Sequence, residues 1–359
     1  MARLTAISGL GGKGPACFLI ETRAARLLLD LGYGPQPGLL PNVDGVGKVD
    51  ALLLSHGHRD HAGGFELLGK VGNPPIYATD IVRRLLPAGT NSRPLPLHGT
   101  TEVAGLQVTT GRSGHAPGGV WLHIAVDGGL LYMGDNSGES ILYAADAPPP
   151  ATAIIIDASY GAYETPLSEC TKKFDPVFDA GPVLLPIPVA GRGPEIALYL
   201  IRSGRAAPHI DDALRASLTR LAAQDSPCLK PGITPELAQL AANAPAIEKP
   251  AGVMLAGIAD ATAGEAAKQV AAWEHQTTPA IVFSGYLPPG TPAERLTTSG
   301  RASYLRWNVH PRLAENARLV RAVGAQIVLP AFGDAARHRQ AWETAFAPAR
   351  VVVSGSVEF

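Results

Sequence analysis

A short run of histidines and acids carries the clearest chemical signal in the sequence. Ser55-His56-Gly57-His58-Arg59-Asp60-His61 places three imidazoles and one carboxylate within six residues, directly after the apolar run Ala51–Leu54. A strand that ends in a tight loop of this kind can point all four side chains into one pocket. Neutral imidazoles and carboxylates are the ligands that suit zinc and similar divalent metals. The pattern therefore predicts a metal site. The alternative, a surface loop that happens to be rich in histidine, is disfavoured because an apolar strand precedes it.

The elements that must position this loop are short strands separated by Gly/Pro turns. Apolar runs of strand length recur through the first half of the chain, and a helix is expected to open at Phe65–Leu68 after the metal loop. The expected strands are Leu27–Leu31, Ala51–Leu54, Gly105–Thr110, Trp121–Val126, Leu130–Met133 and Ala153–Ile156. This pattern suits a sandwich of sheets with helices outside it.

From about residue 164 onward, apolar residues recur at the spacing of helices. Helices are expected at Pro194–Arg202, Asp211–Ala223, Thr234–Ala242 and Ala263–Trp273, with strands at Val183–Leu185 and Ala280–Phe283. After residue 300 a helix, strand, helix and strand are expected at Arg312–Val323, Gln326–Leu329, Ala335–Phe346 and Arg350–Val353. We therefore predict a first domain of residues 1–163 and 301–359, interrupted by an inserted α/β domain of residues 164–300.

Several motifs resemble the metallo-β-lactamase superfamily. His56-Gly57-His58-Arg59-Asp60-His61 is similar to its signature. Cys17–Glu21 followed by Leu27–Gly32 resembles its first hairpin, which carries Asp30. Ser113–Gly118 resembles the segment that supplies the next histidine ligand, and Leu131–Asp135 the strand that ends in a metal-bridging aspartate. This resemblance covers about the first 160 residues. It implies an α/β fold, the αββα sandwich of that superfamily.

Motifs in the second half resemble the β-CASP branch, whose members are mostly RNA or DNA nucleases. They are shorter than the first motifs, and their order and spacing together carry the resemblance. They are Ile154–Gly161 with its acidic strand end at Asp157, Gly191-Arg192-Gly193-Pro194-Glu195, Phe283-Ser284-Gly285-Tyr286 with Gly290-Thr291, and Asn308-Val309-His310. The inserted domain is accordingly expected to be β-CASP-like.

The resemblance implies a metal centre with two positions. His56, His58 and His115 would hold the first ion, Asp60 and His61 the second, and Asp135 would bridge both. Zn²⁺ is the expected metal and Mn²⁺ the alternative, because imidazole and carboxylate accept both. Two ions close together lower the pKa of a shared water and neutralise charge in the transition state. His115 and Asp135 could instead be turn residues, but each lies beside a strand end.

Other residues are assigned supporting roles. Asp30 is expected to orient a ligating histidine. Asp157 and His310, together with Asp60, are the candidate catalytic residues; Asp157 would handle a proton, and His310 would protonate the leaving group or contact phosphate. His310 could equally be a core or surface histidine. The predicted substrate contacts are Arg192, Ser284, Gly285 and Tyr286.

One departure from the β-CASP pattern bears on the second ion. Members of that branch carry a further histidine, motif C, which completes the second position. Phe332 occupies the matching place here, and phenylalanine cannot bind a metal. We therefore expect one firmly bound ion and a second that is weak, with His338 or Asp334 as candidate replacements.

Composition limits the partners and the compartment. The net charge is −1, although nucleic-acid-binding proteins usually have a surplus of basic residues. A local basic patch, or merely solvated charges, could come from Lys172, Lys173, Arg192, Arg202, Arg205, Arg295 and Arg301. The three widely spaced cysteines, the absence of a signal peptide and the lack of a long apolar stretch predict a cytoplasmic protein without a membrane segment.

The combined reading is a metal-dependent phosphodiesterase or nuclease that acts on nucleic acid, with single-stranded RNA preferred over DNA as the expected substrate. The neutral charge and Phe332 support an alternative, a metallohydrolase for a small phosphodiester, lactone or thioester. A third reading is a non-catalytic metal-binding relative, which the intact histidine motif disfavours. The β-CASP branch often forms dimers, and the sequence leaves open whether this chain is a homodimer.

Overall fold

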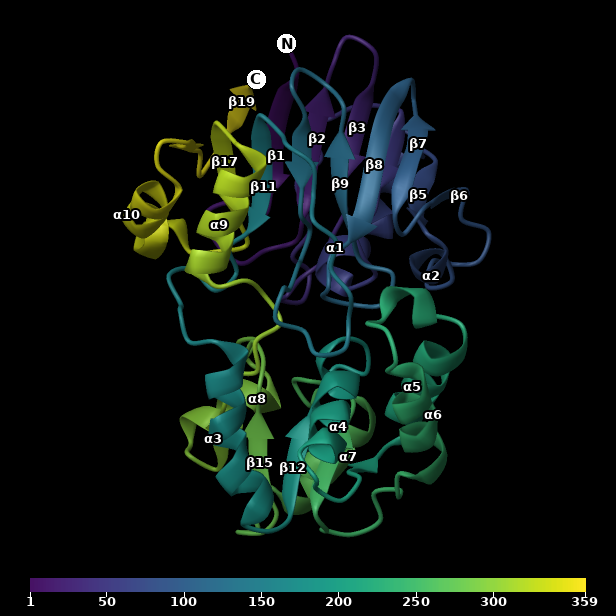
Figure 1. The fold of residues 1–359 in the computed structure, drawn as a ribbon, viewed down its shortest axis with the longest axis vertical. Helices are drawn as coiled ribbons and strands as arrows, with labels where there is room; N and C mark the ends of the chain where they lie inside the picture. Colours follow the sequence, from purple (N-terminus) through teal and green to yellow (C-terminus); the bar gives the residue numbers. More distant parts are fainter. The chain divides into compact units, whose positions relative to one another are not determined.

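The computed structural model describes residues 1–359, and the chain divides into two compact units. The first unit comprises Met1–Gly138, Ala144–Glu164 and His310–Phe359, and the second comprises Glu139–Tyr143 and Thr165–Val309. The short segment Glu139–Tyr143 thus leaves the first unit and returns to it, a crossing that the sequence did not indicate. Figure 1 shows the elements of each unit.

Two seven-stranded sheets form the centre of the first unit. The first has the order β19 (Ser356–Glu358), β1 (Arg3–Ser8), β2 (Cys17–Glu21), β3 (Arg26–Leu29), β4 (Ala51–Leu53), β5 (Ile76–Thr79) and β6 (Ser92–Leu95). The second has the order β18 (Arg350–Val351), β17 (Ile327–Ala331), β11 (Ala153–Asp157), β10 (Leu130–Tyr132), β9 (Val120–Ile124), β8 (Leu106–Arg112) and β7 (Gly99–Val103). Both sheets mix parallel and antiparallel pairs.

Both faces of these sheets are buried, and the strand sequences show why. Leu27 and Leu29 of β3 enter the core between the sheets, whereas Leu28 enters a second core on the outer face. In β11, Ile155 faces the shared core and Ile154 the opposite side. Since successive side chains of a strand point to opposite faces, a continuous apolar run is what a doubly covered sheet requires.

Helices cover the outer faces and complete the αββα sandwich that the sequence predicted. The helices α9 (Leu313–Val323) and α10 (Ala335–Phe346) pack on the second sheet (Figure 1). The first sheet is covered by η1 (Phe65–Val71) and neighbouring loops, with α1 (Arg59–Ala62) and α2 (Asp80–Arg83) nearby in the chain. The expected helix at Phe65–Leu68 is a 3₁₀ helix, and the metal loop itself contains the α-helical turn α1.

The second unit contains a parallel five-stranded sheet, which agrees with the predicted inserted α/β domain. Its strand order is β13 (His209–Ile210), β14 (Val253–Ala256), β12 (Val183–Pro186), β15 (Ala280–Phe283) and β16 (Ala302–Tyr304). Its helices are α3 (Leu167–Asp179), α4 (Arg192–Arg202), α5 (Asp212–Ala223), η2 (Ser226–Cys228), α6 (Thr234–Asn243), α7 (Gly264–Trp273) and α8 (Pro292–Thr298).

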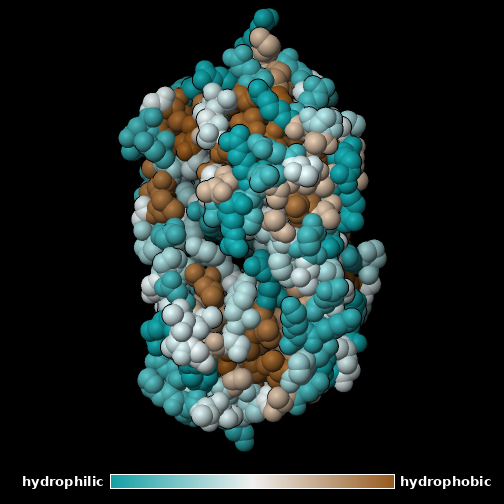
Figure 2. Space-filling model, turned by 90° about the vertical axis from the view of Figure 1, so that its left-hand side faces the viewer, coloured by the Kyte–Doolittle hydropathy of each residue, from teal (hydrophilic) through white to brown (hydrophobic).

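The surface is mainly polar. Figure 2 shows one face of the molecule, on which hydrophobic residues form scattered patches among hydrophilic ones. The large hydrophobic side chains that are exposed are few: Met1, Leu39, Leu85, Ile258, Tyr286 and Tyr304. No helix combines the length and the apolar character that a membrane crossing requires. The three cysteines are buried free thiols.

Candidate metal centre

The predicted metal loop follows β4 and lies directly against the end of β3. Leu31 N donates a hydrogen bond of 2.9 Å to His61 O, which ties the two segments together. Gly32 lies at the closest approach, and a Cβ there would collide with the carbonyl oxygen of Asp60. Only glycine lets the chain pass this close, so Gly32 fixes where the loop can lie.

Asp30, which follows β3, fixes the metal loop by contacts with Ser55 and His61. Its fully buried carboxylate accepts hydrogen bonds from Ser55 N at 2.7 Å, Ser55 Oγ at 2.6 Å and Tyr132 OH at 2.5 Å. His61 Nδ1 lies 2.7 Å from Asp30 Oδ2, which assigns the ring proton to Nδ1 and leaves Nε2 facing Asp135 Oδ1 at 3.1 Å. This contact agrees with the orienting role expected for Asp30.

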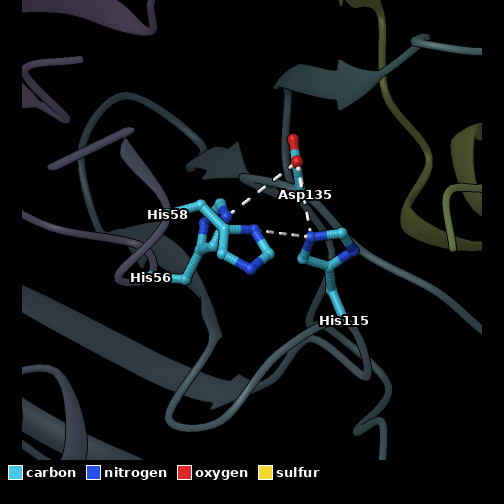
Figure 3. A group of neighbouring side chains, drawn as sticks. All are labelled: His56, His58, His115 and Asp135. Atoms are coloured by element: carbon cyan, nitrogen blue, oxygen red, sulfur yellow. Dashed lines mark hydrogen bonds and ion pairs between the residues drawn. The ribbon is translucent and has the colours of Figure 1, made fainter. Parts of the chain in front are cut away.

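His56, His58, His115 and Asp135 point their polar atoms toward one common space (Figure 3). One ligand atom from each lies within 4.8 Å of the others. Asp135 Oδ2 is 3.9 Å from His56 Nε2 and 3.5 Å from His115 Nε2, and His115 Nε2 is 3.1 Å from His58 Nδ1. The Nε2 atoms of His56 and His58 are buried without a hydrogen-bond partner.

This arrangement fits a divalent metal ion. A buried nitrogen without a partner is costly unless a ligand completes it. Burial, together with neighbouring imidazoles, holds the pKa of His56 well below its usual range, and burial also lowers the pKa of His58. Both rings are therefore neutral near pH 7, which is the form that binds a metal. Three imidazoles and one carboxylate are a donor set typical of zinc and similar ions.

Asp135 belongs to all three side-chain groups that could hold an ion. Burial by itself would raise its pKa, but the imidazoles of His61 and His310 outweigh burial, and the pKa lies well below its usual range. The carboxylate is therefore ionised. The first group is the cluster with His56, His58 and His115. The second joins Asp135 to Asp60 and His61, and the third joins it to Asp157 and His310. Within each group the ligand atoms lie within 4.8 Å of one another.

Asp157 and His310 form a hydrogen-bonded pair beside the histidine cluster. His310 Nδ1 lies 2.7 Å from Asp157 Oδ2, and Asp157 also accepts hydrogen bonds from Ser159 N at 3.0 Å and Asn136 N at 3.3 Å. The ring of His310 lies 5.0 Å from the ring of His115 between centroids. Two of the three candidate catalytic residues, from distant parts of the sequence, thus lie next to each other and next to the metal cluster.

One group in the centre was not anticipated. Lys13, in the glycine-rich loop between β1 and β2, places Nζ 3.7 Å from Asp60 Oδ2, and each side chain is 24% exposed. Burial lowers the pKa of Lys13, but the carboxylates of Asp60, Asp135 and Asp157 outweigh burial and raise it overall. A lysine in a glycine-rich loop has no distinctive sequence pattern, so only the three-dimensional structure could reveal this contact.

The sequence comparison agrees with this geometry. The family description "Metallo-beta-lactamase superfamily" matches residues 10–175, a span that contains the metal loop, His115, Asp135 and Asp157. Residues 10–175 are thus similar to the metallo-beta-lactamase superfamily.

Curated relatives match just over half of the length of this chain. Transcription termination factor FttA of Cenarchaeum symbiosum is 26% identical over 251 residues, which are 55% of this chain and 38% of the relative. The RNase J-like protein of Methanocaldococcus jannaschii is 28% identical over 54% of this chain and 53% of its own length. Endoribonuclease YSH1 of Saccharomyces cerevisiae is 28% identical over 53% of this chain and 32% of its own length. The matches therefore span less than two thirds of these relatives and show distant homology to β-CASP proteins.

A solved structure shares the fold over the whole chain. The crystal structure of a protein of unknown function from Enterococcus faecalis V583 superposes with a TM-score of 0.60 and covers 99% of both chains at 13% identity. At this identity the likeness concerns the fold alone.

The residues predicted to contact the substrate lie together in the second unit. Arg192 begins α4, and its guanidinium lies against Gly285, where a Cβ would collide with it. Ser284 is buried with no hydrogen-bond partner for Oγ, and Tyr286 is 48% exposed. These residues follow β12 and β15, which are neighbours in the sheet.

The predicted basic patch is largely taken up by contacts within the second unit. Arg202 pairs with Glu236, Arg205 with Asp175 and Asp179, and Arg295 with Glu274, while Arg301 donates to carbonyl oxygens of Trp273, Glu274 and Pro279. Lys172 and Lys173 are exposed on α3. The interpretation of these arginines as ordinary solvated or structural charges is therefore favoured over a continuous basic patch.

Proposed function

We propose that this chain is a metal-dependent phosphodiesterase that hydrolyses RNA. The observation that carries the proposal is the hydrogen-bonded pair of Asp157 and His310 beside the four-residue metal cluster. Hydrolysis of a phosphodiester needs an activated water on one side and a proton for the leaving oxygen on the other. This centre offers a ligand set for the first task and an imidazole for the second.

The metal ligands in this proposal are His56, His58, His115 and Asp135. A divalent ion held by them would lower the pKa of a bound water and stabilise negative charge on the attacked group. Burial restricts His56, His115 and Asp135, and Asp30 holds the adjacent His61 by a hydrogen bond. Rigid placement matters because a ligand set that is already ordered loses little entropy on binding.

The leaving-group proton is assigned to His310. Asp157 is fully buried and accepts from His310 Nδ1, so it fixes the tautomer and stabilises the protonated ring. The other ring nitrogen, Nε2, is then available to donate a proton to the departing 3′ or 5′ oxygen. His310 is 14% exposed at its side chain, which is consistent with access to a substrate.

The second unit supplies the proposed substrate contacts. In parallel α/β sheets, ligands bind outside the carboxyl ends of strands where the direction of the connections reverses. Here β12 connects toward β13 on one side, and β15 connects toward β16 on the other, so the reversal falls between β12 and β15. Arg192 and Ser284 offer hydrogen-bond donors there, and the exposed ring of Tyr286 offers a stacking surface for a base.

The names of two matched relatives, an endoribonuclease and an RNase J-like protein, support RNA as the substrate class. The net charge of −1 and the paired arginines favour the second candidate, hydrolysis of a small phosphodiester, lactone or thioester. A polyanion draws most of its binding free energy from lysine and arginine contacts. The two candidates differ in what they predict for long RNA.

The test compares two substrates and two variants. Metal-stripped protein is supplied with Zn²⁺ or Mn²⁺ and assayed on labelled single-stranded RNA and on bis(4-nitrophenyl) phosphate, whose leaving group needs no proton. We expect metal-dependent cleavage of RNA. The variant His310→Ala should lose about 10²–10⁴-fold on RNA and much less on the nitrophenyl ester. The control His98→Ala alters a histidine that is exposed on the surface, away from the centre, and should match the wild type.

Two results would reject the nuclease proposal. One is the absence of metal-dependent cleavage of RNA and DNA alongside turnover of the nitrophenyl ester, a lactone or a thioester. The other is an equal loss on both substrates in His310→Ala, because a leaving-group acid must matter more for the poorer leaving group.

A further inference from the structure

The sides of Asp135 differ in the number of ligands that the chain provides. On one side it meets three imidazoles, those of His56, His58 and His115. On another side it meets only Asp60 and His61, and on a third it meets Asp157 and His310, which are already hydrogen-bonded to each other. The residue at the place where the β-CASP branch has a further histidine is Phe332, and its ring has no donor atom.

Phe332 closes this second side with apolar surface. It follows β17, is 2% exposed, and its ring centroid lies 5.0 Å from that of His61 in an edge-on arrangement. It also contacts Phe18 edge-on at 6.2 Å between centroids. Its backbone has φ +64, a conformation that bulky side chains rarely adopt and that histidine tolerates better. The ring therefore packs against a candidate ligand where a ligand atom would be needed.

A positive charge is present on this same side. Lys13 Nζ lies 3.7 Å from Asp60 Oδ2. Asp60 is therefore engaged in an ion pair with a group of the protein itself. A divalent ion bound at Asp60 would have to displace this ammonium or lie beside it, and two cations so close repel each other strongly in a buried setting.

Backbone hydrogen bonds tie the loop that carries Lys13 to the segment that carries Phe332. Phe332 N donates to Gly9 O at 2.7 Å, and Ala335 N donates to Gly11 O at 3.3 Å. Leu10 forms an isolated bridge with Ala331, immediately before Phe332. Lys13 and Phe332 thus lie on two segments that are hydrogen-bonded to each other.

We infer that this chain binds one divalent ion, at His56, His58, His115 and Asp135, and that the Lys13 ammonium takes the place of a second ion beside Asp60. The ammonium supplies one positive charge next to Asp60, and Phe332 removes the ligand that a second ion would require. The inference concerns the number of ions and does not depend on what the substrate is.

The test counts metal ions per chain. Protein is saturated with Zn²⁺, freed of excess by gel filtration, and analysed by inductively coupled plasma mass spectrometry against protein concentration. We expect one ion per chain for the wild type and for Asp60→Asn, because Asp60 does not bind the ion that is present. Two ions in the wild type, or loss of the ion in Asp60→Asn, would overturn the inference.

Variants at Lys13 and Phe332 test the two causes separately. Phe332→His alone should still bind one ion, because the ammonium remains. The double variant Lys13→Met with Phe332→His should bind two. The matched control, Lys13→Arg with Phe332→His, keeps the positive charge and should bind one. Two ions in Phe332→His alone, or in the arginine control, would refute the role of Lys13.

A double variant that binds only one ion would also contradict the inference, provided that it is folded. Its fold is checked by circular dichroism and by a thermal unfolding midpoint close to that of the wild type. If the double variant does not fold, the ion counts of the wild type and of Asp60→Asn still decide the question, since both keep Lys13 and Phe332.

Discussion

The two units of this chain bury charged side chains in different ways. In the first unit, buried imidazoles and carboxylates converge on one space, and the Nε2 atom of His56 has no hydrogen-bond partner there. In the second unit, the buried carboxylate of Glu195 accepts a hydrogen bond from Ile141 N at 2.6 Å, within a loop of the same unit. The first pattern leaves atoms for a ligand, whereas the second uses a buried carboxyl group to join two segments.

The difference teaches how burial separates a binding site from a structural contact. A buried polar atom that finds a protein partner contributes to folding, and one that does not must gain its partner from outside or reduce stability. On this criterion the first unit carries the metal chemistry. Substitutions in the first unit should therefore change metal binding and activity, and substitutions at Glu195 should change stability and its dependence on pH.

The largest expected effect comes from removing a ligand. His115→Ala deletes one of three imidazoles around Asp135, and we expect the bound zinc to fall to a small fraction of one ion per chain. Hydrolysis should fall by at least about 10²-fold, since the loss of residues that merely orient ligands costs 10–100-fold. Metal analysis and initial rates measure both. One zinc ion per chain in His115→Ala would contradict the claim that this imidazole of the first unit binds the metal.

A backbone effect in the first unit should come next. Gly32→Ala places a Cβ against the Asp60 carbonyl, and the strand end and the metal loop must then move apart. We expect a loss of about 3 kcal/mol or more in the free energy of unfolding, measured by urea titration. Gly69→Ala is the control, because a Cβ there meets no atom within 4 Å. Equal stability of the two variants would show that Gly32 does not fix the loop.

In the second unit, pH should separate Glu195 from an ordinary carboxylate. Burial raises the pKa of Glu195 from 4.5 to about 7 in the folded chain. The folded state therefore keeps a proton that the unfolded state releases, so its stabilising effect is complete below pH 4.5 and is lost as pH rises through 7. From pH 4.5 to 8 the wild type should lose about 3 kcal/mol of unfolding free energy relative to Glu195→Gln.

Urea unfolding of the full chain across this range measures the effect. The control is Glu248→Gln, which changes an exposed carboxylate of the same unit and should give a difference that is flat with pH. A flat difference for Glu195→Gln as well would mean that the buried carboxyl is ionised throughout. The second unit would then resemble the first in holding a buried charge.

The smallest effect is expected at the surface of the second unit. Arg202 and Glu236 form an ion pair with a shortest distance of 2.6 Å, but the side chains are 40% and 32% exposed. Arg202→Gln should change the unfolding free energy by only about 0.5 kcal/mol, and less at high salt. The same variant tests the basic patch: a large loss of RNA binding would show that this arginine contacts the substrate despite its pairing.

The sequence predicted the fold best where its signals are local. The run from His56 to His61 lies in one loop, and doubly buried strands such as β11 read as apolar segments, so both were visible without coordinates. The resemblance to a known superfamily then placed His115 and Asp135, which no local pattern could join to the loop. The expected α-helix at Phe65 is a 3₁₀ helix, preceded by Gly63 and Gly64, which have low helix propensity.

What the sequence could not predict depends on contacts between distant segments. Lys13 approaches Asp60 because the loop after β1 bonds to residues that follow β17, more than 300 positions away in the chain. The helix α3 was not predicted although its buried residues have helical spacing; it contains Pro176, a residue type that disfavours helix interiors. The sequence placed Glu195 only in a motif. Its raised pKa results from burial in the folded chain, which no local sequence pattern predicts.

The most direct test of the central claim is anomalous diffraction at the zinc absorption edge from crystals of the zinc-loaded protein. The account predicts an anomalous peak enclosed by His56, His58, His115 and Asp135, within bonding distance of all four. A well-ordered zinc-loaded crystal with no peak there, or with zinc bound only elsewhere, would contradict it.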